Sequence, residues 1–336
     1  MEVIFDCFFE ETFLRLERSG LKTKQKRKDV IDHLTAIILG TSKGQNVTAT
    51  ETCTLAVISA INYHQRKKCE NNNVCLMGKF HNVLYIGLKI AWDWGVTDSD
   101  VVKTLLYEIF QCEQNFERLF LGAIFGSNAP YFIAGWRSDF LDQDENIRAL
   151  VFYLEHAKNA RLEFPVYLNK YEGTKVLRFI DVPIESCGKA SPMRVALQAS
   201  SPDLLLTLLR YGANSNPKDG GMMPIIAILD KLVEAPSTQI HVETCLKILL
   251  KTVPAIEMPY KPFTFEHRKG IFIEKYEILF ERGCIKQQQV FGVMDLKHLC
   301  RHRYTSCLIH WMNYIVCSIM YDSREFANQL SIAIWN

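Results

Sequence analysis

Residues 191–196 read Ser-Pro-Met-Arg-Val-Ala, and residues 223–228 read Met-Pro-Ile-Ile-Ala-Ile, so one short pattern occurs twice. Each copy leads into a run rich in leucine and isoleucine, at 204–209 in the first copy and at 245–250 in the second. A hydroxyl side chain followed by proline begins a helix well, because the oxygen accepts from free backbone amides and proline lacks one. We therefore expect each copy to form a pair of helices.

A polar turn separates the two copies. Residues 211–216 read Tyr-Gly-Ala-Asn-Ser-Asn, and residues 219–221 read Asp-Gly-Gly. Gly212 is expected to end the second helix of the first pair, because glycine readily adopts the left-handed conformation that follows many helices. The neighbouring Asn and Asp side chains favour tight turns. The whole stretch thus predicts two helix pairs joined by a turn.

These two copies resemble ankyrin repeats, which have a period of about 33 residues. Pro192 and Pro224 are 32 positions apart, which is close to that period. Arg194 stands where the family usually has histidine, and Met223 where it usually has threonine. The resemblance implies stacked helix pairs that present a surface to another protein. It also implies that a protein client is bound by turn residues, which are Asn214, Asn216, Lys218 and Asp219.

The chain before residue 186 predicts further helices. Apolar residues recur at helical spacing within 5–16, 52–64, 80–94, 98–110, 116–125 and 146–156. The segment 164–184 instead mixes aromatic and β-branched residues with Gly173 and Pro183, which suits either a short hairpin or a long connecting loop. Between 65 and 74 the sequence is polar and predicts a loop.

The expected fold class is therefore all-α. We expect an ankyrin-type helical repeat stack, with an irregular helical N-terminal region and a C-terminal helical box. Residues 1–185 are interpreted as the N-terminal region, either degenerate ankyrin repeats or a separate helical part. Residues 186–285 are interpreted as ankyrin repeats, and residues 286–336 as the tail.

A basic run lies near the N-terminus. Residues 22–28 read Lys-Thr-Lys-Gln-Lys-Arg-Lys, so five of the seven are positively charged. Such a run suits a nuclear address or a phosphate-binding patch. We favour a solvated connection between two helices. The net charge of the whole chain is only +2, which gives no reason to expect a nucleic-acid partner.

The composition indicates a globular protein of the cytosol or nucleus. Apolar residues make up 48% of the 336-residue chain and charged residues 23%, which excludes a disordered polymer. The N-terminus lacks the features of a signal peptide, and no uncharged apolar run reaches the roughly 18 residues of a membrane span. Most of the 11 cysteines lie in apolar helical runs, which fits reduced core thiols.

The C-terminal part predicts an amphipathic helix. One face of a helix over 294–308 carries Leu296, Leu299, Cys300, Tyr304 and Leu308. The opposite face is basic. Such a helix either lays its apolar edge in a groove of a partner or caps the helix pairs of its own chain.

Residues 296–301 read Leu-Lys-His-Leu-Cys-Arg and are similar to the start of a SOCS box, the element that follows the repeats in the ankyrin-and-SOCS-box family. The resemblance implies binding to Elongin C, in its complex with Elongin B, through Leu296, Leu299, Cys300 and Leu308. It further implies that a cullin and a RING protein join the complex and that a bound client is ubiquitinated. SOCS boxes usually continue into a Leu-Pro-rich segment that selects the cullin, whereas no proline follows Pro262 in this chain. The alternative is an ankyrin-type scaffold without a ubiquitin ligase.

Local motifs give no reason to expect catalysis, a cofactor or a metal. The chain has no glycine-rich phosphate loop, no Gly-x-Ser-x-Gly and no His-Glu-x-x-His. The acidic residues between 139 and 145 are better explained as a helix start than as a calcium loop. Two sets of potential zinc ligands lack a spacing that fixes their geometry. They are His298, Cys300, His302, Cys307 and His310 in the tail, and His64, Cys69, Cys75 and His81 near the N-terminus.

Overall fold

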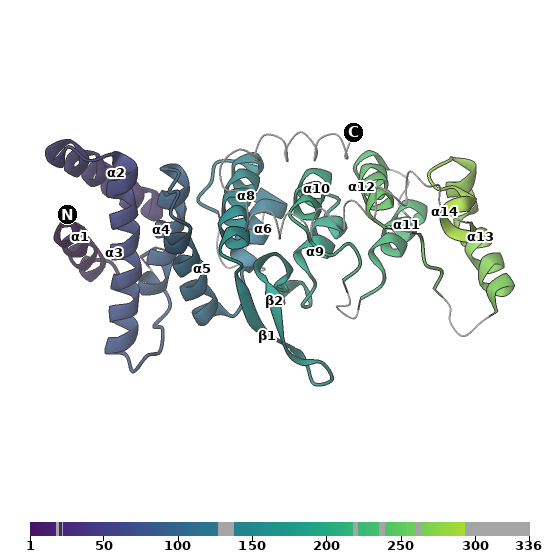
Figure 1. The fold of residues 1–336 in the computed structure, drawn as a ribbon, viewed down its shortest axis with the longest axis horizontal. Helices are drawn as coiled ribbons and strands as arrows, with labels where there is room; N and C mark the ends of the chain where they lie inside the picture. Colours follow the sequence, from purple (N-terminus) through teal and green to yellow (C-terminus); the bar gives the residue numbers. More distant parts are fainter. Residues whose placement is uncertain are drawn as a thin grey trace, which may run out of the picture. The chain divides into compact units, whose positions relative to one another are not determined.

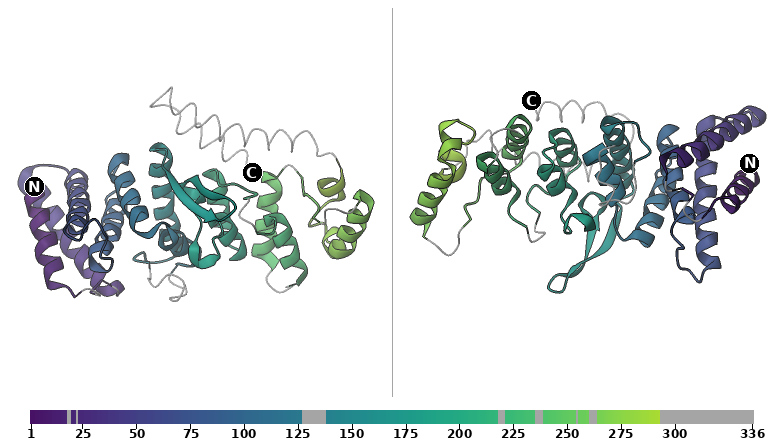
Figure 2. Two further views of the ribbon diagram at one scale, coloured as in Figure 1. Left: turned by 90° about the horizontal axis from the view of Figure 1, so that it is seen from below. Right: turned by 180° about the vertical axis from the view of Figure 1, so that it is seen from behind.

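The computed structural model describes residues 1–17, 20–21, 23–126, 138–217, 221–234, 239–253, 255–259 and 264–292. These residues are mostly helical, as expected, and the strands named among them form one two-stranded sheet (Figures 1 and 2). Contacts within the chain divide it into two compact units, Met1–Pro192 and Met193–Asn336. None of the helices described has both the length and the apolar character needed to cross a membrane.

The N-terminal unit begins with five helices: α1 Glu2–Arg15, α2 Lys24–Gln45, α3 Ala49–Glu70, α4 Lys79–Asp93 and α5 Ser99–Glu113. Helix α3 packs against the other four and is the centre of this group (Figure 1). Phe9 and Phe13 of α1 are fully buried and lie against the ring of Tyr63 in α3. Burying a phenylalanine contributes about 1.5–3 kcal/mol, so the apolar residues at helical spacing in α1 attach this helix to the core.

Side-chain caps determine where α3 and α5 begin. The Thr48 hydroxyl accepts from the Glu51 N–H, and the Glu51 carboxylate accepts from the Thr48 N–H, which is a capping box. The Asp98 carboxylate caps α5 by accepting from the N–H groups of Asp100 and Val101. The helices predicted at 52–64 and 98–110 are thus confirmed. The loop predicted at 65–74 is wrong in its first half, since α3 continues to Glu70 and the connection covers 71–78.

The rest of this unit consists of α6 Glu117–Phe125, α8 Gln143–Asn159 and an antiparallel hairpin of β1 Glu163–Asn169 and β2 Gly173–Arg178. Of the two interpretations of 164–184, the hairpin is confirmed. Phe164 of β1 is fully buried and lies against the rings of Phe110 and Phe116. Two short 3₁₀ helices, η2 Phe179–Asp181 and η3 Glu185–Cys187, follow the hairpin. The buried aromatic side chain of β1 therefore anchors the hairpin to the helices.

The basic run at 22–28 is not a connection. Helix α2 begins at Lys24, with the Thr23 hydroxyl as its cap, so most of the run forms the first turns of a helix. Arg27 is fully buried, and its Nε donates to Asp139 Oδ1 at 2.6 Å. A second donor of the guanidinium, Nη1, lies 2.9 Å from the Leu21 carbonyl oxygen. The interpretation as a solvated segment is therefore wrong for Arg27, which belongs to the core.

The C-terminal unit contains successive helix pairs: α9 Pro192–Gln198 (whose first residue closes the preceding unit), α10 Pro202–Arg210, α11 Pro224–Glu234, α12 Gln239–Thr252, α13 Phe265–Glu281 and α14 Gln287–Phe291. The helix starts predicted at Pro192 and Pro224 are confirmed. Helix α12 packs against α10 and α11, and α11 also packs against α13. Gly212, at φ 89°, follows α10 in the left-handed conformation that the sequence predicts. Consecutive pairs therefore lie side by side within this unit.

Arg194 in α9 braces the connection between α10 and α11. Its side chain is buried, and its guanidinium donates to the carbonyl oxygens of Met222 and Pro217. A Cβ atom at Gly221 would lie 2.9 Å from the Arg194 Cζ, so glycine permits this close approach. The arginine found at the histidine position of the repeat pattern thus has a structural role.

The polar residues 286–289, which the sequence suggests as a separator between the body and the tail, belong to the structured part of the C-terminal unit. Lys286 is the N-cap of α14 and 287–289 form its first turn, where the Gln289 carbonyl oxygen accepts from the Ile256 N–H at 2.9 Å. The tail helix predicted at 294–308 lies outside the described residues. The three-part division into 1–185, 186–285 and 286–336 stays a prediction.

Candidate metal centre

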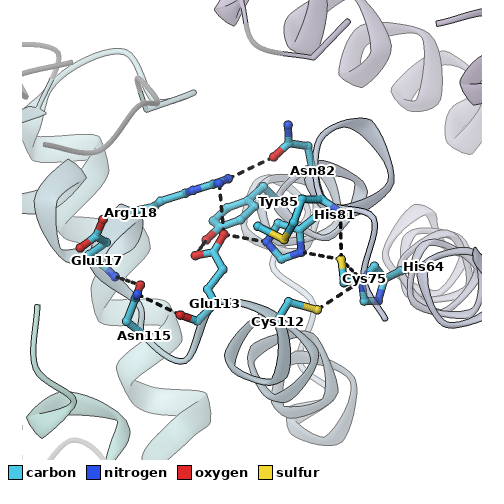
Figure 3. A network of polar contacts seen from close by, with 11 residues as sticks. His64, Cys75, His81, Asn82, Tyr85, Cys112, Glu113, Asn115, Glu117 and Arg118 are labelled. Carbon is cyan, nitrogen blue, oxygen red and sulfur yellow. Dashed lines mark hydrogen bonds and ion pairs between the residues drawn. The ribbon is translucent and has the colours of Figure 1, made fainter. Parts of the chain in front are cut away.

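Four potential metal ligands meet where α3, α4 and α5 pack together (Figure 3). They are His64 from α3, Cys75 from the connection 71–78, His81 from α4 and Cys112 from α5. One ligand atom of each lies within 4.8 Å of the ligand atoms of the other three. Across the part of the chain that the structure describes, this is the one group of three or more such residues.

The distances between the ligand atoms match a tetrahedral site. His64 Nε2 lies 3.4 Å from Cys75 Sγ and 3.5 Å from Cys112 Sγ, and Cys75 Sγ lies 3.8 Å from His81 Nδ1. A tetrahedral zinc ion with Zn–S of about 2.3 Å and Zn–N of about 2.0 Å separates its sulfur and nitrogen ligands by about 3.5 Å. These three sulfur–nitrogen separations therefore suit an ion of this size, and all four ligand atoms lie within 4.8 Å of one another.

Each imidazole turns its other nitrogen toward a glutamate. His64 Nδ1 lies 3.3 Å from Glu108 Oε2, and His81 Nε2 lies 2.6 Å from Glu113 Oε1. A carboxylate behind a histidine ligand fixes the tautomer and the ring orientation and strengthens the nitrogen that binds the metal. Both glutamates come from the last turns of α5, close to Cys112. One helix therefore supplies a thiol ligand and the supports of both imidazole ligands.

The two glutamates are themselves held in place. Glu113 accepts from the Tyr85 hydroxyl at 2.8 Å and lies 3.2 Å from the Arg118 guanidinium. Arg118 also lies over the Tyr85 ring, 4.7 Å from its centroid. Glu108 accepts from Gln65 Nε2 at 2.8 Å. The side chains of Glu108 and Glu113 are 10% and 7% exposed, so the carboxylates that support the imidazoles are largely shielded from solvent.

Donors around the Cys75 sulfur favour its thiolate. The Cys112 thiol, the two imidazoles and the Met77 N–H all point to this sulfur, and together they hold the pKa of Cys75 far below its ordinary value despite burial. The hydrogen bond of the Cys112 thiol to Cys75, together with burial and the negative charge on Cys75, raises the pKa of Cys112. Burial lowers the pKa of His64 and His81, but the Cys75 sulfur and the glutamates outweigh it and raise both. The thiolate is the form of cysteine that binds metals.

The connection 71–78 folds so that Cys75 returns to the helices. Asn72 and Asn73 have positive φ angles of 55° and 62°, a conformation that asparagine tolerates better than most residues. The Asn71 side chain donates to the Val74 carbonyl oxygen at 3.0 Å and closes the turn. The three consecutive asparagines at 71–73 are thus explained by the turn that presents Cys75.

The sequence pattern indicates three of these four residues as potential ligands, which are His64, Cys75 and His81. Cys69 is exposed near the end of α3 and does not belong to the group, whereas Cys112, which the sequence pattern does not single out, does. The predicted helix ended at Phe110, one turn too early. The signal was present, because Val101, Leu105, Glu108 and Cys112 share one face of a helix. The expectation of core thiols is also only partly right, since Cys53 and Cys245 are the fully buried cysteines among those described.

The residues expected to bind partners are only partly described. Asn214 and Asn216 are exposed in the turn after α10, where the Asn214 side chain accepts from the Asn216 N–H at 3.0 Å. Lys218 and Asp219 lie outside the described residues. So do all the residues expected to bind Elongin, which are Leu296, Leu299, Cys300 and Leu308, and the histidines and cysteines of the tail.

No protein-family model, curated protein or solved structure matches this chain. Its function is therefore inferred from its own residues.

Proposed function

We propose that this protein is a non-catalytic substrate-recognition subunit of an Elongin–cullin–RING ubiquitin ligase. Its helix pairs bind a protein client, and its C-terminal helix binds Elongin C. The observation that carries the proposal is the repeated helix pair that begins at Pro192 and again at Pro224, followed along the chain by the SOCS-like sequence at 296–301.

The packing of the C-terminal unit supports the first half of this proposal. The second helix of one pair, α10, packs against the second helix of the next, α12, and the first helix α11 packs against α13. Stacking of equivalent helices produces an extended surface, which is how repeat proteins bind partners.

The turn after α10 supports a client site at its edge. Asn214 and Asn216 are exposed there, and Met222 is 55% exposed beyond them. Polar turn residues beside an exposed, adaptable methionine are typical of protein-binding surfaces. Arg194 donates to the carbonyl oxygens of Pro217 and Met222, so described residues on both sides of 218–220 are held by one side chain.

A scaffold without ligase association is the second candidate. It is favoured by the missing Leu-Pro-rich segment, since no proline follows Pro262. In that case the apolar face of the tail helix closes the stack of its own chain, and the client surface is unchanged.

Binding of the purified full chain to the Elongin B/C complex tests the proposal. We expect the intact chain to retain Elongin B/C. We expect Leu296→Asp/Cys300→Asp to lose at least about 30-fold in affinity, because charge on the central apolar anchors of an interface costs about 2 kcal/mol or more. Ile240→Asp is the matched control, since Ile240 is 81% exposed on α12 and is not part of the SOCS-like sequence. If the intact chain does not retain Elongin B/C, the ligase proposal fails and the scaffold remains.

A further inference from the structure

We propose that His64, Cys75, His81 and Cys112 bind one zinc ion as a structural site that ties α3, α4 and α5 to the connection 71–78. Nothing in the sequence pattern assigns this site. It lies in the N-terminal unit and is independent of the proposed adaptor function.

The ligand set selects zinc over harder cations. Two thiol sulfurs and two imidazole nitrogens at tetrahedral spacing suit zinc, whereas magnesium and calcium require oxygen ligands. All four positions of the tetrahedron are taken by protein side chains. No position remains for a water molecule or a substrate, which is the mark of a structural zinc site rather than a catalytic one.

The charges around the cluster balance when zinc is present. Two thiolates neutralise the dipositive ion. His81 keeps one N–H to donate to Glu113 at 2.6 Å, and His64 Nδ1 faces Glu108 Oε2 at 3.3 Å. His64 and His81 are 1% and 0% exposed. Two histidines buried this deeply, each with one nitrogen on a carboxylate and the other on a sulfur, form the arrangement found behind metal-binding imidazoles.

The ion also accounts for the conformation of the connection. Met77 has a φ of 51°, in the left-handed region that a side chain such as methionine rarely adopts. Cys75, two residues earlier, is the only ligand that comes from outside the three helices. A bond from Cys75 to zinc fixes the connection and offsets the cost of this backbone conformation.

The metal content of the purified full chain tests the proposal directly. The chain is produced in cells supplied with zinc, freed of weakly bound metal by dialysis, and analysed by elemental analysis and X-ray absorption. We expect about one zinc per chain, surrounded by two sulfur and two nitrogen ligands. A chain without zinc, or zinc surrounded mainly by oxygen, would contradict the proposal.

Ligand substitutions separate this site from adventitious binding. We expect Cys112→Ser to weaken zinc binding by more than about 100-fold in competition with a chromogenic chelator, since even second-shell changes cost about 10–100-fold. Cys69→Ser is the matched control, because Cys69 is an exposed thiol on α3 outside the cluster. If both variants retain zinc equally well, the proposed zinc site is wrong.

Two further measurements keep the test decisive if Cys112→Ser does not fold. Cobalt added to the metal-free wild-type chain should give the intense visible bands of a tetrahedral site and a thiolate-to-cobalt charge-transfer band. Glu113→Gln keeps all four ligands, and we expect it to weaken zinc binding by about 10–100-fold. A disulfide between Cys75 and Cys112, detected by mass spectrometry of the freshly purified chain, or a cobalt spectrum without thiolate bands, would overturn the assignment.

Discussion

Arg27 and Asp139 form a buried ion pair in the N-terminal unit. The Arg27 side chain is 0% exposed and that of Asp139 is 8% exposed, with 2.6 Å between Nε and Oδ1. Burial raises the pKa of Asp139, and Arg27 opposes that shift only in part. Because the folded pKa is raised, the contribution of Asp139 to stability is present at low pH and is lost as the pH rises through that pKa. Both members of the pair are taken out of water, so each buried charge depends on the other as its counter-charge.

We expect Asp139→Asn to lower the free energy of unfolding by about 3–5 kcal/mol, because the charge of the fully buried Arg27 then loses its counter-charge. Chemical denaturation at neutral pH measures this loss. The double variant Arg27→Met/Asp139→Leu should recover a large part of it, since an apolar pair has no charge to desolvate. If the two substitutions simply add to a larger loss, the pair stabilises the fold and this interpretation is wrong.

At the scale of elements, helix ends in this chain are set by local chemistry. The side chains of Thr48 and Asp98 cap the starts of α3 and α5. Gly212 follows the end of α10 in the left-handed conformation. These signals are short-range, which is why most helices could be placed from the sequence. The ends of α3 and α5 were placed too early, because side chains of their last turns are held by distant partners. Gln65 binds Glu108, and Lys67 binds Glu10 in another helix.

Two glycine substitutions in the C-terminal unit should change stability in opposite directions. Gly212→Ala should lower the free energy of unfolding by about 1–2 kcal/mol, because φ is 89° at this position and a Cβ is strained there. Gly270→Ala should raise it by about 0.4–1 kcal/mol, because Gly270 lies inside α13 with open space around it and alanine favours a helix. Thermal and urea denaturation of both variants check the two signs. Destabilisation by both, to the same extent, would show that the conformation at Gly212 is not the cause.

At the scale of the whole molecule, the two compact units suggest two unfolding events. We expect calorimetry of the zinc-loaded chain to resolve two transitions. A strong chelator should lower the temperature of one of them, because removal of a ligand that binds only the folded state destabilises that state. Asp139→Asn should lower the temperature of that same transition, and Gly212→Ala that of the other. If chelation moves both transitions equally, the metal does not act on the N-terminal unit alone.

The sequence by itself determined the helices and the helix pairs of the C-terminal unit. Apolar spacing, proline at a helix start and glycine after a helix act within a few residues, so Pro192, Pro224 and Gly212 could be read correctly without coordinates. The metal cluster was decided by the tertiary structure. His64 and Cys112 are 48 positions apart, and only the packing of α3 against α4 and α5 brings their side chains together and excludes Cys69. Arg27 became a core residue for the same reason, since its partner Asp139 lies far along the chain.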